Sequence, residues 1–318
     1  CSAEDLRGAL EGVDGVYHLA AYQDYMPDYS TFLRVNAVST ALLFELIVAL
    51  RLPVSKVVLA SSQSVYGEGK YRCPECGVVY PPFRSQEQLA RGEWELRCPR
   101  TGHRLEPLLI DEARANPHTA YGISKYALEL TSLNLGRKHG IPATCMRYSI
   151  VQGPRNSFYN AYSGIARIFA LRLLHGQAPV CYEDGCQQRD YVYVGDVARA
   201  NLVALEDARS DYQCLNVAGQ KSTTVLEVAH LLARLCGAQV EPRVSGEYRF
   251  GDTRHTTSSW EAMGQLGWRP EVPLEGFLTA YVEWVRSQPG LADYYAATEK
   301  RMRAQGVLRR VAAASPPG

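Results

Sequence analysis

The sequence predicts an α/β fold in which a doubly wound parallel sheet carries a smaller lobe toward the C-terminus. Short apolar runs alternate along the chain with longer segments of helical period. Strands that alternate with helices imply right-handed crossovers and parallel strand neighbours. The 318 residues, of which 46% are apolar, are enough for one large domain or two modest ones.

The expected elements follow one another in the order that such a sheet needs. Strands are expected at residues 15–21, 55–62 and 142–149, with helices near 30–50 and 118–139. Later helices are expected near 160–175, 194–208, 223–236 and 274–287, together with short strands such as 212–218. We therefore expect a sheet domain over residues 1–150 and a lobe over residues 151–288 that retains some core elements.

Two segments depart from this alternation. Residues 70–107 lie between a strand and the next helix and contain a Cys-x-x-Cys sequence, so they are expected to be an insertion. Residues 289–318 become rich in Ala, Arg and Pro. They are expected to form a C-terminal helix and a tail, of which roughly the last ten residues fray.

Charge and composition favour a small-molecule partner in the cytoplasm. The 34 basic and 33 acidic residues give a net charge of +1, which provides no field to attract nucleic acid or an anionic membrane. The apolar run at 40–50 ends before Arg51 and is shorter than the roughly 18 to 20 residues that span a bilayer. Nine cysteines, an odd number, do not indicate a secreted disulfide framework.

The predicted catalytic group combines a phenol, an ammonium and a serine hydroxyl at the end of a strand. Tyr121 and Lys125 are four residues apart in a segment of helical period, so both lie on one helix face. A phenol has a pKa of about 10, and a nearby ammonium favours its ionised form, so the pair could move a proton on or off a hydroxyl. Ser61 and Ser62 end an apolar strand, where the ligand crevice of an open α/β sheet lies.

Each of these signals has a plain structural alternative. A second Tyr-x-x-x-Lys pair, Tyr66 and Lys70, encloses Gly67 and Gly69, which disfavour a helix. A serine after a strand is also common turn chemistry. The combination of the three groups favours Tyr121 and the catalytic interpretation.

Several motifs occur in the order and approximate spacing found in one large enzyme family. They are HLAA (18–21), Asn36 of LRVNAVSTALL, VVLASSQSVYG (57–67), YGISKYALE (121–129), MRYSIVQGP (146–154), QRDYVYVGDVARA (188–200) and RFGDTRHTTSSWEAMGQLGWRP (249–270). Over most of its length the chain resembles the extended short-chain dehydrogenase/reductases, and within them the NAD-dependent nucleotide-sugar epimerases and dehydratases. The sequence SSQSVYGEG and the insertion most resemble enzymes of the dTDP-L-rhamnose 4-epimerase type. The resemblance implies a Rossmann-like fold, an NAD cofactor, a nucleotide-diphosphate sugar as partner, and a homodimer.

The resemblance also implies a role for each matching residue. Tyr121 would be the general base, Lys125 would hold the ribose hydroxyls of NAD, and Ser62 would bind the reacting hydroxyl. The cofactor would further contact Leu19, Ala20, Ala21, Asn36, Ser61 and Ser149. The nucleotide sugar would contact Gln63, Asn160, Arg189 and Arg249, with the two guanidinium groups clamping its diphosphate. The structural alternative for Arg189 is an ion pair with Asp190.

The residues after the active-site hydroxyl select the reaction. Dehydratases of the family place Asp-Glu there, and the decarboxylating relatives keep the Glu, whereas this chain has Gln63 and Ser64. Neither side chain exchanges a proton usefully near neutral pH, which favours a 4-epimerase. Many UDP-galactose epimerases read Arg-Tyr-Phe-Asn where this chain ends in Ile150, and an apolar wall there suits a sugar with a C6 methyl group.

Two other functions remain open at this stage. An NADP-dependent reductase of a 4-keto nucleotide sugar would use the same three catalytic groups but release its cofactor at each turnover. A non-catalytic homologue would keep the fold and use the insertion to dock a protein or nucleic acid. The intact catalytic residues and the neutral charge oppose the second function.

Cysteines in the insertion have the spacing of a metal site. Cys73 and Cys76 could hold two corners of a zinc tetrahedron, with Cys98 and His103 at the other two. Thr101 stands where a repeated Cys-x-x-Cys would place its second cysteine. A metal-free loop and a redox dithiol are the alternatives.

The sequence shows no Gly-rich turn ahead of HLAA. A dinucleotide-binding half normally begins with a strand, that turn and a helix whose N-terminus receives the pyrophosphate. We therefore expect the chain that begins at Cys1 to be a fragment that binds NAD weakly and is itself inactive, with function belonging to a longer product.

Overall fold

The computed structural model describes residues 2–24, 27–157 and 164–312. Its central sheet has four parallel strands in the order β1-β2-β6-β10. The strands are β1 (Gly15–His18), β2 (Lys56–Ser62), β6 (Ala143–Tyr148) and β10 (Cys214–Val217). The predicted α/β fold with a parallel sheet is confirmed.

Helices cover both faces of this sheet. The elements that follow β1 are α2 (Tyr29–Phe32), a π-helical turn η1 (Leu33–Val38) and α3 (Ser39–Ala49), and the others are α1 (Ala3–Ala9), α5 (Ala120–His139) and α7 (Val194–Glu206). On one face, Val57 and Leu59 of β2 pack with Leu43 of α3 and with α5. Val58 packs on the other face with α7, because neighbouring strand residues point to opposite sides.

The helical stretch Tyr29–Ala49 is long and apolar enough, by length and composition, to cross a membrane. The expectation that the apolar run at 40–50 is too short to span a bilayer left out residues 29–39, which belong to the same helical stretch. Its residues Leu43, Phe44 and Ile47 are buried in the core under the sheet. Such burial is typical of a core helix.

The second lobe is built around a small mixed sheet. Its strands are β7 (Ile150–Gln152), β9 (Gln188–Tyr193), β11 (Ser222–Thr224) and β14 (His255–Thr256), with β9 in the middle. The helices of the lobe are α6 (Ile165–Leu174), α8 (Val225–Leu235), α10 (Leu274–Arg286) and, near β10, α9 (Glu261–Gln265). Side chains of α6, α8 and α10 form one apolar core with Tyr191 of β9.

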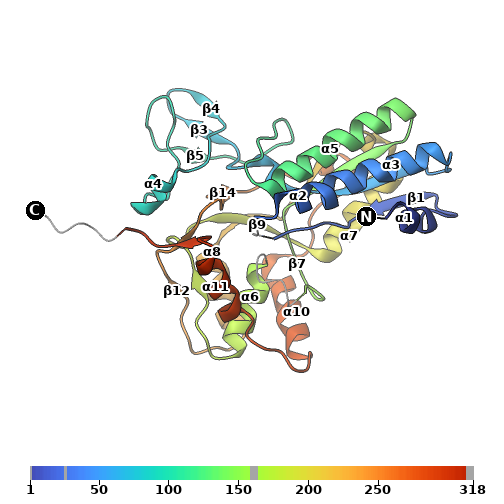
Figure 1. Cartoon of the computed structure of the whole chain (residues 1–318). Helices are drawn as coiled ribbons and strands as arrows, with labels where there is room; N and C mark the ends of the chain where they lie inside the picture. The colour runs from blue at the N-terminus through green and yellow to red at the C-terminus, as the bar shows by residue number, and fades with distance from the viewer. Residues whose placement is uncertain (1, 25–26, 158–163, 313–318) are drawn as a thin grey trace, which may run out of the picture.

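The insertion forms a separate small sheet that projects from the body (Figure 1). It contains β3 (Tyr71–Cys73), β4 (Gly77–Val79), β5 (Glu106–Pro107) and the short helix α4 (Gln86–Ala90), with strand order β4-β3-β5. Six buried side chains make its core: Tyr71, Cys73, Val79, Leu96, Cys98 and Leu105. The predicted insertion is therefore a folded unit.

Residues 308–312 are more ordered than expected. After α11 (Tyr295–Ala304), strand β15 (Leu308–Arg309) pairs with β13 (Tyr248–Arg249). The amide of Ala312 then donates to the carbonyl of Ala90 in the insertion, at 2.8 Å. The prediction that roughly the last ten residues fray is thus wrong for residues 309–312, because the backbone pairs with two other segments. The remaining strands, β8 (Val180–Cys181) and β12 (Arg243–Val244), pair with each other.

Candidate active site

Strand β2 delivers its serines to the edge where the parallel strands end. Ser62 caps the 3-10 turn η2 (Gln63–Tyr66), and its Oγ accepts a hydrogen bond of 3.2 Å from the Ser64 amide. Gly67 then adopts a φ of +58°, and a Cβ there would lie 2.3 Å from the Asn116 carbonyl oxygen. Only glycine fits this turn, which folds the chain back beside the start of α5.

Helix α5 presents Tyr121 on its first turn, against the η2 turn. The hydroxyl of Thr119 caps the helix by accepting from the Gly122 amide at 3.0 Å. A Cβ on Gly122 would lie 2.5 Å from the Ser64 carbonyl oxygen, so glycine allows the two turns to touch. Tyr121 and Ser62 consequently line one cavity of about 590 Å³.

Lys125 lies one helical turn behind Tyr121 and is 1% exposed. Its Nζ donates to the carbonyl of Ala60 at 2.6 Å and lies 5.9 Å from the centre of the Tyr121 ring. Burial lowers the pKa of Lys125 to about 8, against the opposing effect of Cys145 and Glu129. The ammonium therefore remains mostly protonated at neutral pH, beside the phenol.

A buried ion pair supports the catalytic strands from behind. Both carboxylate oxygens of Glu129 accept from Arg147, at 2.8 Å each, and Oε1 also accepts from Ser61 Oγ at 2.5 Å. Arg147 further donates to the hydroxyl of Tyr66 at 2.9 Å. Burial would lower the pKa of Arg147, but its bonds with Glu129 outweigh burial and raise it. Ser61, predicted to contact the cofactor, thus has its hydroxyl hydrogen committed to this network.

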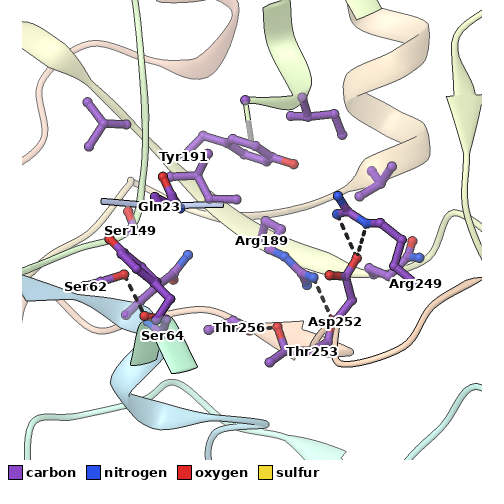
Figure 2. A pocket seen from close by; sticks show the side chains of 18 of the residues that line it. Gln23, Ser62, Ser64, Ser149, Arg189, Tyr191, Arg249, Asp252, Thr253 and Thr256 are labelled. Carbon is purple, nitrogen blue, oxygen red and sulfur yellow. Dashed lines mark hydrogen bonds and ion pairs between the residues drawn. The ribbon is translucent and has the colours of Figure 1, made fainter. Parts of the chain in front are cut away.

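The cavity has a hydroxyl end and a guanidinium end. Figure 2 shows Ser62, Ser64 and Ser149 on one side and Arg189 and Arg249 on the other. These five side chains, together with Gln63 and Tyr121, come from both lobes. The structure therefore brings most of the predicted polar site residues to a single cavity.

Both predicted arginines are anchored by the protein. Arg189 donates to three backbone carbonyls, those of Gln188, Arg254 and Thr253, at 2.6 to 2.8 Å. Arg249 forms an ion pair of 2.7 Å with Asp252. The alternative partner of Arg189, Asp190, is buried and instead accepts from the amides of Gly219 and Ser258.

A third guanidinium, not predicted from the sequence, also lines the cavity. Arg167 on α6 is 4% exposed, and its Nη1 donates to Asn156 Oδ1 at 2.8 Å and to the Ser157 carbonyl at 2.7 Å. Its Nε and Nη2 are buried and have no hydrogen-bond partner in the described part of the chain. Burial lowers the pKa of Arg167 to about 10, so the group stays charged at neutral pH.

Other lining residues were also missed. His118 packs on Phe83 with ring centres 4.3 Å apart, and burial lowers its pKa. Its Nδ1 is buried without a hydrogen-bond partner among the described residues. The only signal for His118 in the sequence is its place three residues before Tyr121.

Several predicted cofactor residues lie outside the cavity lining. Leu19 is 52% exposed after β1, and Ala20 and Ala21 follow it. Asn36 is buried and holds the 22–24 segment, because it bonds the amide and carbonyl of Tyr22 and also Ser124 Oγ. Asn160 lies outside the described residues.

The cysteines of the insertion come together, but the predicted histidine does not join them. The Sγ atoms of Cys73, Cys76 and Cys98 lie within 4.8 Å of one another. His103 instead places Nδ1 3.2 Å from Thr101 Oγ1 and 3.4 Å from a carboxylate oxygen of Glu75.

Comparisons with known proteins agree with this site. The model of the "NAD dependent epimerase/dehydratase family" matches residues 1–90 and 101–218. A dTDP-L-rhamnose 4-epimerase of Burkholderia thailandensis is 31% identical over 86% of this chain and 75% of that protein. The structure of a UDP-glucose 4-epimerase of Thermotoga maritima, solved with UDP-glucose, has a TM-score of 0.71 and 28% identity, covering 90% of this chain and 82% of that one. The NAD complex of the UDP-glucose 4-epimerase of Thermus thermophilus has a TM-score of 0.68 and 26% identity at the same two coverages.

Proposed function

Because this chain belongs to the NAD-dependent epimerase/dehydratase family, we propose that it is an NAD-dependent nucleotide-sugar 4-epimerase. One observation supports this reaction above the others. The cavity joins Tyr121 and Ser62 at one end to arginines at the other, and the two residues after Ser62 are Gln63 and Ser64. A sugar hydroxyl could react at the first end while the diphosphate is held at the second.

The residues around Tyr121 fit a dinucleotide. Among the described residues Lys125 Nζ donates one hydrogen bond, to the carbonyl of Ala60, so its other N–H groups are available to ribose hydroxyls. NAD would supply a reversible acceptor for the hydride of C4. Lys125 would hold its ribose, and Ser149 lines the same cavity as Tyr121.

Proton transfer would be carried out by Ser62, Tyr121 and Lys125. Ser62 Oγ would hold the C4 oxygen while Tyr121 takes the hydroxyl proton, leaving a 4-keto sugar after hydride loss. The ammonium of Lys125 stabilises the phenolate before the proton arrives. After the 4-keto sugar has rotated in the cavity, Tyr121 would return the proton to the C4 oxygen as the reduced cofactor supplies the hydride to the other face, so the reaction would balance without a second acid or base.

The wall of the cavity suggests which sugar it accepts. Ile150 lines the cavity at the position where many UDP-galactose epimerases carry an amide. A hydrocarbon there leaves the hydroxyl of a C6 hydroxymethyl group without a partner, whereas a methyl group packs against it. We propose a dTDP-6-deoxyhexose as the preferred substrate.

The test is a panel of UDP-, dTDP- and GDP-sugars incubated with the protein, with NMR detection of C4 inversion. We expect inversion with NAD retained through purification, and a preference for 6-deoxy sugars of about tenfold. Net production of a reduced sugar with release of the cofactor would instead assign a reductase. Loss of water across C5 and C6 would instead indicate a dehydratase with a second acid and base in the cavity. His118 is an imidazole that lines it.

Arg167 should contribute to binding of the diphosphate. Arg167→Met removes a buried charge with two nitrogens, Nε and Nη2, that have no partner among the described residues, so we expect the Kd for the nucleoside diphosphate to rise about 10- to 100-fold. Calorimetry measures this change. Arg172→Met is the matched control, because Arg172 lies on the same helix, pairs with Asp293 and does not line the cavity. Equal affinities for the two variants would remove Arg167 from the binding site.

A further inference from the structure

The insertion contains the same five-residue turn twice. The sequences are Cys-Pro-Glu-Cys-Gly at 73–77 and Cys-Pro-Arg-Thr-Gly at 98–102. Both turns end on a glycine of positive φ, +71° at Gly77 and +74° at Gly102. The two turns therefore resemble a pair of metal-binding knuckles in which one cysteine has been replaced by Thr101.

The side chains of these turns converge on one point. The Sγ atoms of Cys76 and Cys98 are 3.8 Å apart, and Cys73 Sγ is 3.5 Å from Thr101 Oγ1. A tetrahedral zinc ion with bonds of about 2.3 Å to sulfur places two sulfur ligands about 3.8 Å apart, and a sulfur and an oxygen ligand about 3.5 Å apart. The Cys76–Cys98 and Cys73–Thr101 separations therefore match the ligand separations of a zinc tetrahedron.

Other uses of these cysteines fit the structure less well. All three are free thiols, so none is joined to another in a disulfide. Cys73 and Cys98 are 1% and 2% exposed, and a redox pair needs an accessible sulfur. The small core around them is of the kind that usually needs a metal for stability, because a segment below about 40 residues buries little apolar surface.

We propose that Cys73, Cys76 and Cys98 bind one zinc ion, with the hydroxyl of Thr101 at the fourth corner. This changes the ligand set expected from spacing, because His103 contacts Thr101 and lies outside the three-sulfur cluster. Three thiolates select a soft ion such as zinc over magnesium or calcium. The neutral hydroxyl is a weaker ligand than a thiolate, so the site binds zinc less tightly than a four-cysteine knuckle.

The site has a structural consequence for the cavity. The chain between the two knuckles carries Arg84 and Glu95, which form buried ion pairs with Glu183 and Arg254 of the second lobe. An ordered insertion holds these charges in place, and Phe83 beside Arg84 lines the cavity. Zinc therefore stabilises one wall of the cavity and takes no part in the reaction.

The zinc content of the purified protein tests this proposal independently of enzyme activity. We expect about one equivalent of zinc in the purified protein, none in Cys76→Ser, and an unchanged amount in Cys186→Ser, whose exposed thiol lies outside the cluster. Cobalt exchanged into the site should show the visible absorption of tetrahedral thiolate coordination. A protein purified under reducing conditions that is fully folded and contains no zinc would overturn the proposal.

A second variant tests the role of Thr101. It also tests the zinc site if Cys76→Ser does not fold. Thr101→Cys completes four thiolates, so we expect zinc to bind at least about tenfold more tightly in competition with a chelator. Affinity equal to that of the unchanged chain would show that Thr101 does not occupy the fourth corner.

Discussion

Tyr121→Phe should lower turnover by about 10² to 10⁴, the usual contribution of a positioned acid–base group. The variant lacks only the phenolic oxygen, so the C4 hydroxyl loses the group that would accept its proton. The ring remains to pack edge-on against Phe32, at 6.5 Å between ring centres. Fold and cofactor content should therefore stay nearly unchanged.

Tyr126→Phe is the matched control for this variant. Tyr126 lies on the same helix and packs against the cluster of Val65, Tyr66 and Ile110, away from the cavity lining. Its turnover should remain close to that of the unchanged protein in the NMR assay. If Tyr121→Phe keeps turnover within a factor of three, Tyr121 is not the general base.

The family and the α/β fold follow from local signals, and both predictions are confirmed. The spacing of apolar residues, with the period of a strand or of a helix, indicates which side of each element faces the core. The strand-end serines and the Tyr-Lys spacing report which side chains share one edge or one helix face. The structure brings Ser62, Gln63, Tyr121, Arg189 and Arg249 to one cavity, while their roles stay predictions.

What the sequence could not predict depends on contacts between distant segments. Arg167 reads as one charge on an amphipathic helix, and only the packing of α6 in the folded second lobe buries it at the cavity. Threonine is not among the usual ligands of zinc, so the sequence alone gives no reason to assign Thr101 to a metal. Its position next to Cys73 becomes visible only when the two knuckles are packed face to face.

Arg254 is the clearest example of a residue whose environment depends on contacts between distant segments. Its substitution should have the largest effect on the free energy of unfolding. Its side chain is 1% exposed and donates to Glu95, Glu183 and Asp184 at 2.6 to 3.1 Å, so one cation joins the insertion to the second lobe. Arg254→Met leaves these carboxylates without their shared partner. Breaking a buried ion pair costs about 3 to 5 kcal/mol, and we expect that loss in the free energy of unfolding.

Arg234→Met provides the surface comparison for Arg254→Met. Arg234 pairs with Glu275 at 2.9 Å, but both side chains are more than half exposed, so its removal should cost less than about 1 kcal/mol. Denaturant unfolding of the two variants measures the difference. Similar losses would mean that the buried network contributes no more than a surface pair.

The pH dependence of stability gives an independent measure of the same network. Burial would raise the pKa of Glu95, but hydrogen bonds to His255 and Arg254 outweigh it and lower the pKa to about 2. Because this value lies below the ordinary 4.5, the folded state holds the proton less tightly than the unfolded state does, and Glu95 stabilises the fold above about pH 4.5. That contribution is lost as the pH falls toward 2. In Arg254→Met the pKa of Glu95 should lie closer to its ordinary value, so the loss of stability between those pH values should be smaller than in the unchanged protein. An equal slope for both proteins would show that Arg254 does not hold the Glu95 carboxylate in its ionised form.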